Sequence, residues 1–312
     1  MLRCVKSSRI ALPLLFVLVA ACVTGCGGGA QSATAGGGKI VAVGAENEYA
    51  NVIEQIGGSY VKVTAIESNP NTDPHTFEAS PSVAEAVGAA KLIVENGVGY
   101  DTYMEKIESA SSNSARKVIN VQKLLGLPES TPNPHLWYKA TTMPAVGKAI
   151  VSDLSALQPA HAAYFQAKAT KFDESLKPWY AAIAKFKASY PNTPVATTEP
   201  VGDYMLEAAG TKNLTPFSLQ ADIMNGTDPA PQNVALQNGL FSGQEVKVFV
   251  HNQQVTDSLT ESFVQAAKRA GIPVVGVYET MPTPGYDYQS WMLAEVKALE
   301  KAVVEHVSTE KL

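Results

Sequence analysis

The sequence contains few cysteines, and all of them lie near its start. The 312 residues include three cysteines, Cys4, Cys22 and Cys26. Because no cysteine follows Cys26, the rest of the chain has no internal disulfide. It also offers no thiolate as a metal ligand or a nucleophile.

Long apolar runs and basic clusters are missing as well. After residue 30 no apolar stretch approaches the roughly 20 residues that a membrane-spanning helix needs. The formal net charge is -5 without a basic run, which argues against nucleic acid as a partner. Hydrophobic residues make up 46% and charged residues 17%, so the chain can bury the cores of two ordinary domains.

Residues 1–26 have the features of a lipoprotein signal peptide. A positive start precedes the apolar run 10–19, which is too short to span a bilayer comfortably but suits a signal-peptide core. Cys22 and Cys26 each follow small residues, as in a bacterial lipobox. We favour Cys26 as the lipid anchor, with Cys22 as the alternative, because a Gly/Ser/Ala-rich flexible tether (27–38) follows it. A plain secretory signal is the other interpretation.

Apolar runs and helical periodicities then alternate along the chain. Such alternation predicts an α/β fold with parallel sheets and helices on both faces. The expected strands are 39–43, 60–66, 91–95, 117–121, 195–198, 246–251 and 274–278.

Residues 159–189 contain few helix breakers and carry apolar residues every three or four positions, which predicts one long helix with a kink at Pro178. We therefore expect an N-terminal α/β lobe (39–157), a linking helix (158–190) and a C-terminal α/β lobe (191–312), with the ligand site in the cleft between the lobes. In parallel sheets, ligands bind beyond the carboxyl ends of the strands.

Two loops that follow predicted strands have similar sequences. Asp73-Pro74-His75 and Asn133-Pro134-His135 each place a polar residue and a proline before a histidine. Proline stiffens the loop and holds the imidazole at low entropic cost. With five histidines in the whole chain, the match predicts that His75 and His135 are metal ligands. Surface histidines or helix N-caps are the alternative.

Two glutamates stand directly after predicted strands in the second half. Glu199 follows 195–198, and Glu279 follows 274–278. A carboxylate at the end of a buried strand is costly unless it is paired or bound to a cation. Two imidazoles and two carboxylates suit Mn²⁺, Fe²⁺ or Zn²⁺. Each glutamate taken alone also fits a helix N-terminal or solvated position.

The chain resembles the cluster A-I solute-binding proteins, the TroA-like group of zinc and manganese importers, from Lys39 to about Val307. The segments 73–82 and 133–137 carry the resemblance. It implies His75 and His135 as ligands and Glu199 as the third. The fourth family ligand is usually aspartate, so Glu279 is a departure of one methylene. The resemblance further implies an ABC permease with its ATPase as partner, and lobes that move little.

The expected cargo is a divalent transition metal, with Mn²⁺ slightly favoured over Zn²⁺. The segment 124–133 lacks the histidines that zinc members often carry, and the third ligand is not histidine. We expect His251 to line the cleft and Asp222 to bond to a metal-binding imidazole. We expect His161 and His306 to face solvent.

The leading interpretation is an exported, lipid-anchored, monomeric binding protein on the outer face of the cell membrane, and not an enzyme. A secreted metallohydrolase is one alternative, but no HExxH motif, nucleophile elbow or phosphate-binding loop supports it. A metal-dependent adhesin is the other.

Overall fold

The computed structural model describes residues 38–312. The predicted signal peptide, the choice between Cys22 and Cys26, and all but the last residue of the predicted tether lie outside the described residues. Within them, the chain forms two four-stranded sheets, each entirely parallel.

The sheet of the N-terminal lobe has the strand order β2-β1-β3-β4. Its central strands are almost continuously apolar because helices cover both faces. One apolar cluster joins the sheet to α1 (Asn47–Gly57) and α5 (Thr142–Leu157), and another joins it to α2 (Pro81–Ala89) and α3 (Thr102–Ala110). The strands are β1 (Ile40–Glu46), β2 (Val61–Glu67), β3 (Leu92–Glu95) and β4 (Lys117–Asn120), with the short helix α4 (Val121–Leu124) after the last.

The C-terminal lobe repeats this arrangement with the order β6-β5-β7-β8. Helices α8 (Asp203–Ala208) and α12 (Tyr288–Glu305) belong to the apolar cluster on one face, whereas α9, α10 and α11 belong to the other. The remaining elements are β5 (Pro194–Thr197), β6 (Lys212–Asn213), α9 (Phe217–Met224), α10 (Pro231–Ser242), β7 (Val248–Asn252), α11 (Ser258–Arg269) and β8 (Val274–Val277). Two parallel-sheet α/β lobes are thus present, as the sequence predicted.

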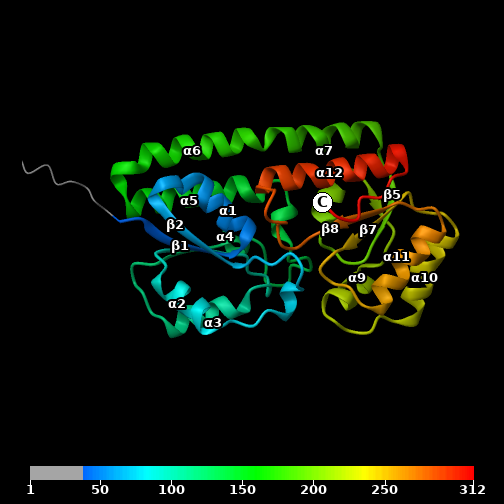
Figure 1. Ribbon diagram of the computed structural model, residues 1–312, viewed down its shortest axis with the longest axis horizontal. Coiled ribbons are helices and arrows are strands. Elements are labelled where there is room, and N and C mark those ends of the chain that lie inside the picture. Colours follow the sequence, from blue (N-terminus) through cyan, green and yellow to red (C-terminus); the bar gives the residue numbers. More distant parts are fainter. Residues whose placement is uncertain (1–37) are drawn as a thin grey trace, which may run out of the picture. The chain divides into compact units, whose positions relative to one another are not determined.

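The bridge between the sheets consists of two helices in line (Figure 1). The first helix, α6 (Ala162–Ser175), follows the short turn η4 (Pro159–His161) and packs on α1 and α5. The second, α7 (Lys177–Ser189), packs on α12 and α8. Another short turn, η1 (Gly58–Tyr60), connects α1 to β2. The interruption is at Leu176, two residues before Pro178, because proline has no N–H to donate to the preceding turn. The expected long helix is therefore a pair of helices with one break.

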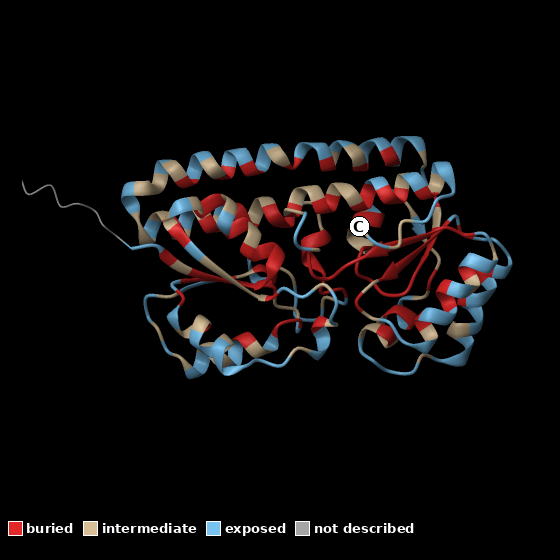
Figure 2. Cartoon of the chain, in the orientation of Figure 1, coloured by how far each residue is buried: buried red, intermediate tan, exposed pale blue. Residues whose placement is uncertain are grey.

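One apolar core passes through both lobes. A single cluster of buried side chains includes Leu92 of β3, Val250 of β7 and Trp291 of α12. Buried residues accordingly gather on the strands and on the inward faces of the helices (Figure 2). Between the lobes, Tyr138 Oη lies at hydrogen-bond distance, 2.8 Å, from both the carbonyl oxygen of Tyr278 and Glu295 Oε1.

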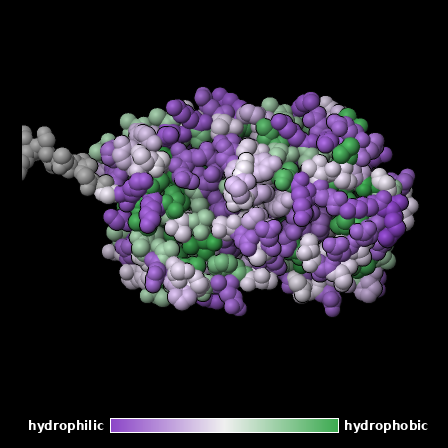
Figure 3. All heavy atoms as spheres, viewed as in Figure 1, coloured by the Kyte–Doolittle hydropathy of each residue, from purple (hydrophilic) through white to green (hydrophobic). Residues whose placement is uncertain are grey.

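Among residues 38–312, no helix combines the length and the apolar character needed to cross a bilayer. On the face shown in Figure 3, hydrophobic residues form small separate groups among hydrophilic ones.

Candidate metal centre

The loop after β2 presents His75. Proline opens the turn η2 (Pro74–Thr76), and the Asp73 carboxylate accepts the backbone N–H of His75 at 2.8 Å. Proline and aspartate together fix the loop locally, as the sequence predicted. The His75 side chain remains 23% exposed, which makes it the most accessible part of the site.

His135 is held more tightly, by Asn133. The Asn133 amide donates from Nδ2 to the carbonyl of Pro200 at 2.7 Å. Its Oδ1 accepts the backbone N–H of His135 at 3.0 Å and lies 2.8 Å from His135 Nδ1. The ring is completely buried. It precedes the turn η3 (Leu136–Tyr138) and lies edge-on to Trp137.

Glu279 follows β8 and is also completely buried. Its backbone N–H, together with that of Thr280, donates to Gln254 Oε1 at 2.7 Å. Its Oε1 accepts from Asn252 Nδ2 at 2.7 Å, and its Oε2 accepts from Tyr100 Oη at 2.9 Å.

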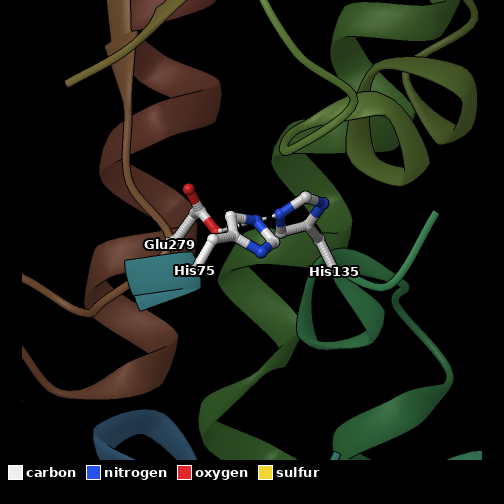
Figure 4. Close-up of side chains that lie close together, drawn as sticks. All are labelled: His75, His135 and Glu279. Carbon is white, nitrogen blue, oxygen red and sulfur yellow. Dashed lines mark hydrogen bonds and ion pairs between the residues drawn. The ribbon is translucent and has the colours of Figure 1, made fainter. Parts of the chain in front are cut away.

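These three side chains converge between the lobes (Figure 4). One ligand atom from each of His75, His135 and Glu279 lies within 4.8 Å of the other two. Glu279 Oε2 is 3.2 Å from His75 Nε2 and 3.1 Å from His135 Nε2. Ligands held at about 2.1 Å in a tetrahedron lie about 3.4 Å apart, so the trio fits a small divalent ion with little rearrangement.

The hydrogen bonds of Asn133 decide which nitrogen of His135 carries the proton. A backbone carbonyl on one side and a backbone N–H on the other fix the orientation of the amide, so Asn133 Oδ1 faces Nδ1. An amide oxygen only accepts, so Nδ1 carries the hydrogen and Nε2 of the neutral ring carries a lone pair. That lone pair points at a carboxylate oxygen 3.1 Å away. Two acceptors in such contact need a cation or a proton between them.

Burial and charge act differently on the two imidazoles. Burial lowers the pKa of His135 below its ordinary value, despite the nearby Glu279 carboxylate. Burial also lowers the pKa of His75, but the hydrogen bond and charge of Glu279, with the charge of Asp73, outweigh it and leave that pKa raised. Burial alone would raise the pKa of Glu279, yet its hydrogen bonds to His135 and His75 hold the pKa well below the usual range. Of the two imidazoles, His75 is therefore the one that binds a proton more readily.

Glu199 lies outside this trio. Its Oε1 is 3.3 Å from Asn252 Nδ2, the nitrogen that also donates to Glu279. Its Oε2 is buried without a hydrogen-bond partner among the described residues. Burial, and next the charge of Glu279, raise the Glu199 pKa well above its ordinary value. The structure thus brings three of the four predicted ligands together. The fourth, Glu199, is linked to them through the side-chain amide of Asn252.

The residues given smaller roles lie elsewhere. His251 is buried and stacks on Phe249, with burial lowering its pKa to about 4. Asp222 lies in α9, and the partner of an imidazole is Asn133 instead. His161 stacks on Tyr60 at 3.7 Å between ring centroids and is only half-exposed, unlike the exposed His306.

Three residues of the site were not predicted from the sequence. Tyr100, Asn252 and Gln254 all contact Glu279 through hydrogen bonds. Each follows or ends a strand in its sheet, at the carboxyl edge where ligands bind. That position is the one sequence signal for them.

The fold and the site define a class: two-lobed α/β proteins with a candidate cation site between parallel sheets. The family described as "ZnuA: Zinc-uptake complex component A periplasmic" matches residues 43–302. The chain belongs to this family.

Individual relatives agree with this assignment. The manganese-binding lipoprotein MntA of Bacillus subtilis is 27% identical over 161 residues, which cover 50% of this chain and 52% of the relative. The zinc-binding protein TroA of Treponema pallidum is 25% identical over 159 residues, which cover 49% and 51%. The chain thus matches about half the length of these curated relatives.

Solved structures share the fold. The periplasmic zinc-binding protein TroA from Treponema pallidum aligns with a TM-score of 0.71 at 18% identity, covering 86% of this chain and 99% of that one. A mutant of the laminin-binding adhesin of Streptococcus agalactiae aligns with a TM-score of 0.70 at 18% identity, covering 85% and 99%.

Proposed function

We propose that the protein captures a divalent transition metal, Mn²⁺ or Zn²⁺, outside the cytoplasm and delivers it to an ABC permease and its ATPase. His75, His135 and Glu279 are the proposed primary ligands, and Glu199 completes the set once an ion is bound. The lone pair of His135 Nε2, aimed at a carboxylate oxygen 3.1 Å away, is the observation that carries the proposal. The membership of the zinc-uptake family and the manganese- and zinc-binding relatives support it.

Glu199 joins the site for an electrostatic reason. Its Oε2 is buried without a partner among the described residues, and burial, followed by the charge of Glu279, raises its pKa. A divalent cation at the trio would stabilise both carboxylates in their charged forms. With two neutral imidazoles and two carboxylates, the loaded site has no net charge, which suits a buried position.

Metal analysis tests the proposal directly. Purified protein should carry about one equivalent of Mn²⁺ or Zn²⁺ by elemental analysis, and chelated protein should rebind one equivalent in titration calorimetry. His135→Ala should abolish this binding. His161→Ala, which removes an imidazole that stacks on Tyr60 and is not part of the converging trio, should leave it unchanged. Equal metal content in wild type and His135→Ala would contradict the proposal.

The anchor, the location and the delivery step form the finer part of the proposal. We infer that Cys26 is acylated and holds the monomeric protein at the outer face of the membrane. Labelling with a radioactive fatty acid should then mark the wild type and Cys22→Ala but not Cys26→Ala.

Deletion of the gene should lower cellular uptake of ⁵⁴Mn or ⁶⁵Zn. Restored uptake from the intact gene, but not from His135→Ala, would link transport to the site.

A further inference from the structure

One amide group touches both carboxylates of the candidate site. Asn252 Nδ2 donates to Glu279 Oε1 at 2.7 Å and to Glu199 Oε1 at 3.3 Å. The two hydrogens of a side-chain amide can serve two acceptors at once. Each glutamate therefore has Oε1 engaged by Asn252. Oε2 of Glu279 faces Tyr100 Oη and the two imidazoles, and Oε2 of Glu199 has no hydrogen-bond partner among the described residues.

The amide itself cannot turn away. The backbone N–H of Asn252 donates to Thr198 Oγ1 at 3.0 Å, and its Oδ1 accepts the backbone N–H of Gln254 at 3.0 Å. Because a backbone N–H requires an acceptor, the oxygen of the amide must face Gln254 and the nitrogen must face the glutamates. The residue is 1% exposed, so water does not compete for these bonds.

An engaged oxygen restricts how a carboxylate binds a metal. A carboxylate can offer both oxygens to one ion, as in sites of high coordination number. Asn252 holds Oε1 of each glutamate on its own side, whereas Oε2 of Glu279 faces both imidazoles, so this arrangement favours binding through Oε2 alone. Two imidazoles and two such carboxylates give four ligands, the number that Zn²⁺ adopts. Mn²⁺ favours octahedral surroundings, which the second carboxylate oxygens would supply.

We propose that Asn252 sets the coordination number of the bound ion, and thereby shifts selectivity from Mn²⁺ towards Zn²⁺. Asn252 is a positioning residue that acts through Glu199 and Glu279. This inference rests on the proposed function, because it requires that both glutamates ligate a metal.

Removal of the amide should therefore change selectivity and geometry together. In Asn252→Ala, the freed oxygens allow bidentate binding. The ratio of the Mn²⁺ dissociation constant to the Zn²⁺ dissociation constant should fall by about tenfold or more, within the range that partners of metal ligands control. Asn252→Ser, whose shorter side chain cannot bridge two carboxylates, should show the same change and serves if the alanine variant does not fold. Asn213→Ala is the matched control, because Asn213 bonds Thr197 and Asp203 in the same lobe.

Cobalt gives a readout of geometry that does not depend on affinity. Four-coordinate Co²⁺ absorbs visible light much more strongly than six-coordinate Co²⁺. Wild type and Asn213→Ala loaded with Co²⁺ should show the intense band, and Asn252→Ala should lose most of it. Circular dichroism melting before metal addition would confirm that each variant is folded.

The outcomes separate the inference from the function on which it rests. A wild-type protein that binds neither Zn²⁺ nor Mn²⁺ would overturn both. Metal binding with a six-coordinate Co²⁺ spectrum in the wild type would overturn the inference alone. An equal loss of both affinities in Asn252→Ala, with an unchanged selectivity ratio and spectrum, would likewise overturn it and leave the function standing.

Discussion

The side-chain amide of Gln254 donates a 2.7 Å hydrogen bond to the carbonyl of Thr72, three residues before His75. The oxygen of the same amide accepts the backbone N–H groups of Glu279 and Thr280. One side chain of the C-terminal lobe thus holds the loops of two proposed ligands that are distant in sequence. Asn133 makes the corresponding connection between the His135 loop and the carbonyl of Pro200.

Loss of the Gln254 connection should weaken both the metal site and the fold. In Gln254→Ala, the buried backbone N–H groups of Glu279 and Thr280 lose their acceptor. Each loss should lower the free energy of unfolding by about 1–3 kcal/mol. Metal affinity should fall about tenfold or more. Urea denaturation and titration calorimetry measure the two effects. Gln166→Ala, on the exposed side of α6, should change neither quantity, and a Gln254→Ala protein with wild-type affinity would argue against the connection.

Asn133 should control the tautomer of His135. In the metal-free wild type above the pKa of His135, ¹⁵N NMR should show the hydrogen on Nδ1. Asn133→Ala should produce a mixture of tautomers and weaken metal binding about 10–100-fold, the usual effect of losing the partner of a ligating histidine. A wild-type spectrum with the hydrogen on Nε2 would contradict the assignment of the lone pair.

The length of Glu279 should matter as much as its charge. Aspartate is one methylene shorter and would withdraw the carboxylate from the 3.1 and 3.2 Å contacts with the two imidazoles. Glu279→Asp should therefore bind metal at least about tenfold more weakly, or about 1.4 kcal/mol. Glu279→Gln, which keeps the length and removes the charge, should also bind weakly and lower the His75 pKa, because burial is then less opposed. Competition against a metal-binding dye measures the affinities, and an unchanged affinity in Glu279→Asp would show that other groups compensate.

Acid should weaken metal binding while it stabilises the metal-free protein. The raised pKa of His75 means that the folded protein binds a proton more tightly than the unfolded chain does. The stabilisation from that proton is complete below the unfolded pKa of about 6.5 and is lost as pH rises through the folded pKa. Burial raises the pKa of Glu67 to about 9 and that of Glu295 to about 8. Both carboxyl groups therefore also make the metal-free protein less stable as pH rises.

A bound metal reverses this dependence, because it requires neutral His75. Between pH 6 and pH 8, the melting temperature should therefore fall for the metal-free protein and the gain from added metal should rise. Calorimetric titrations in buffers of different ionisation enthalpy should show protons released on metal binding near pH 6.5 from both His75 and Glu199, because both pKa values are raised. The number released should fall in His75→Ala, and an unchanged number would assign that proton to another group.

The lobes should move little when metal binds. A single apolar core joins Leu92, Val250 and Trp291 across both lobes, and α6 and α7 span them. The radius of gyration measured by X-ray scattering should change by less than about 1 Å on loading, as in preorganised binding proteins. A larger decrease would indicate hinge closure and contradict this expectation.

Sequence alone predicted the features that depend on neighbouring residues. The motifs around His75 and His135 act locally, through a proline and a polar residue two positions before each histidine. The contacts that complete the site join residues far apart in the chain, such as Tyr100 and Glu279, which are 179 positions apart. A lone tyrosine after a strand gives no sequence signal of its partner. Glu199 and Glu279 occupy equivalent strand ends and share Asn252 as a partner, but Glu279 alone contacts the two imidazoles.

The elements missed by sequence follow the same logic. Helices α9 and α10 lie between predicted strands, and their apolar residues do not follow a single helical period. Their helical form depends on the apolar cluster that they build with β7 and α11. Tertiary packing, which a one-dimensional pattern does not show, decides their structure.

The shared core also limits how a bound ion can leave. Separation of the lobes would expose large aromatic side chains such as Trp137 and Trp291, so we expect unloading to proceed without it. Of the three converging ligands, only His75 reaches solvent. A transporter that lifts the short segment between Asp73 and Phe77 would break one coordinate bond and open a path, while the rest of the molecule stays as it is. We therefore expect the ion to leave past the His75 loop.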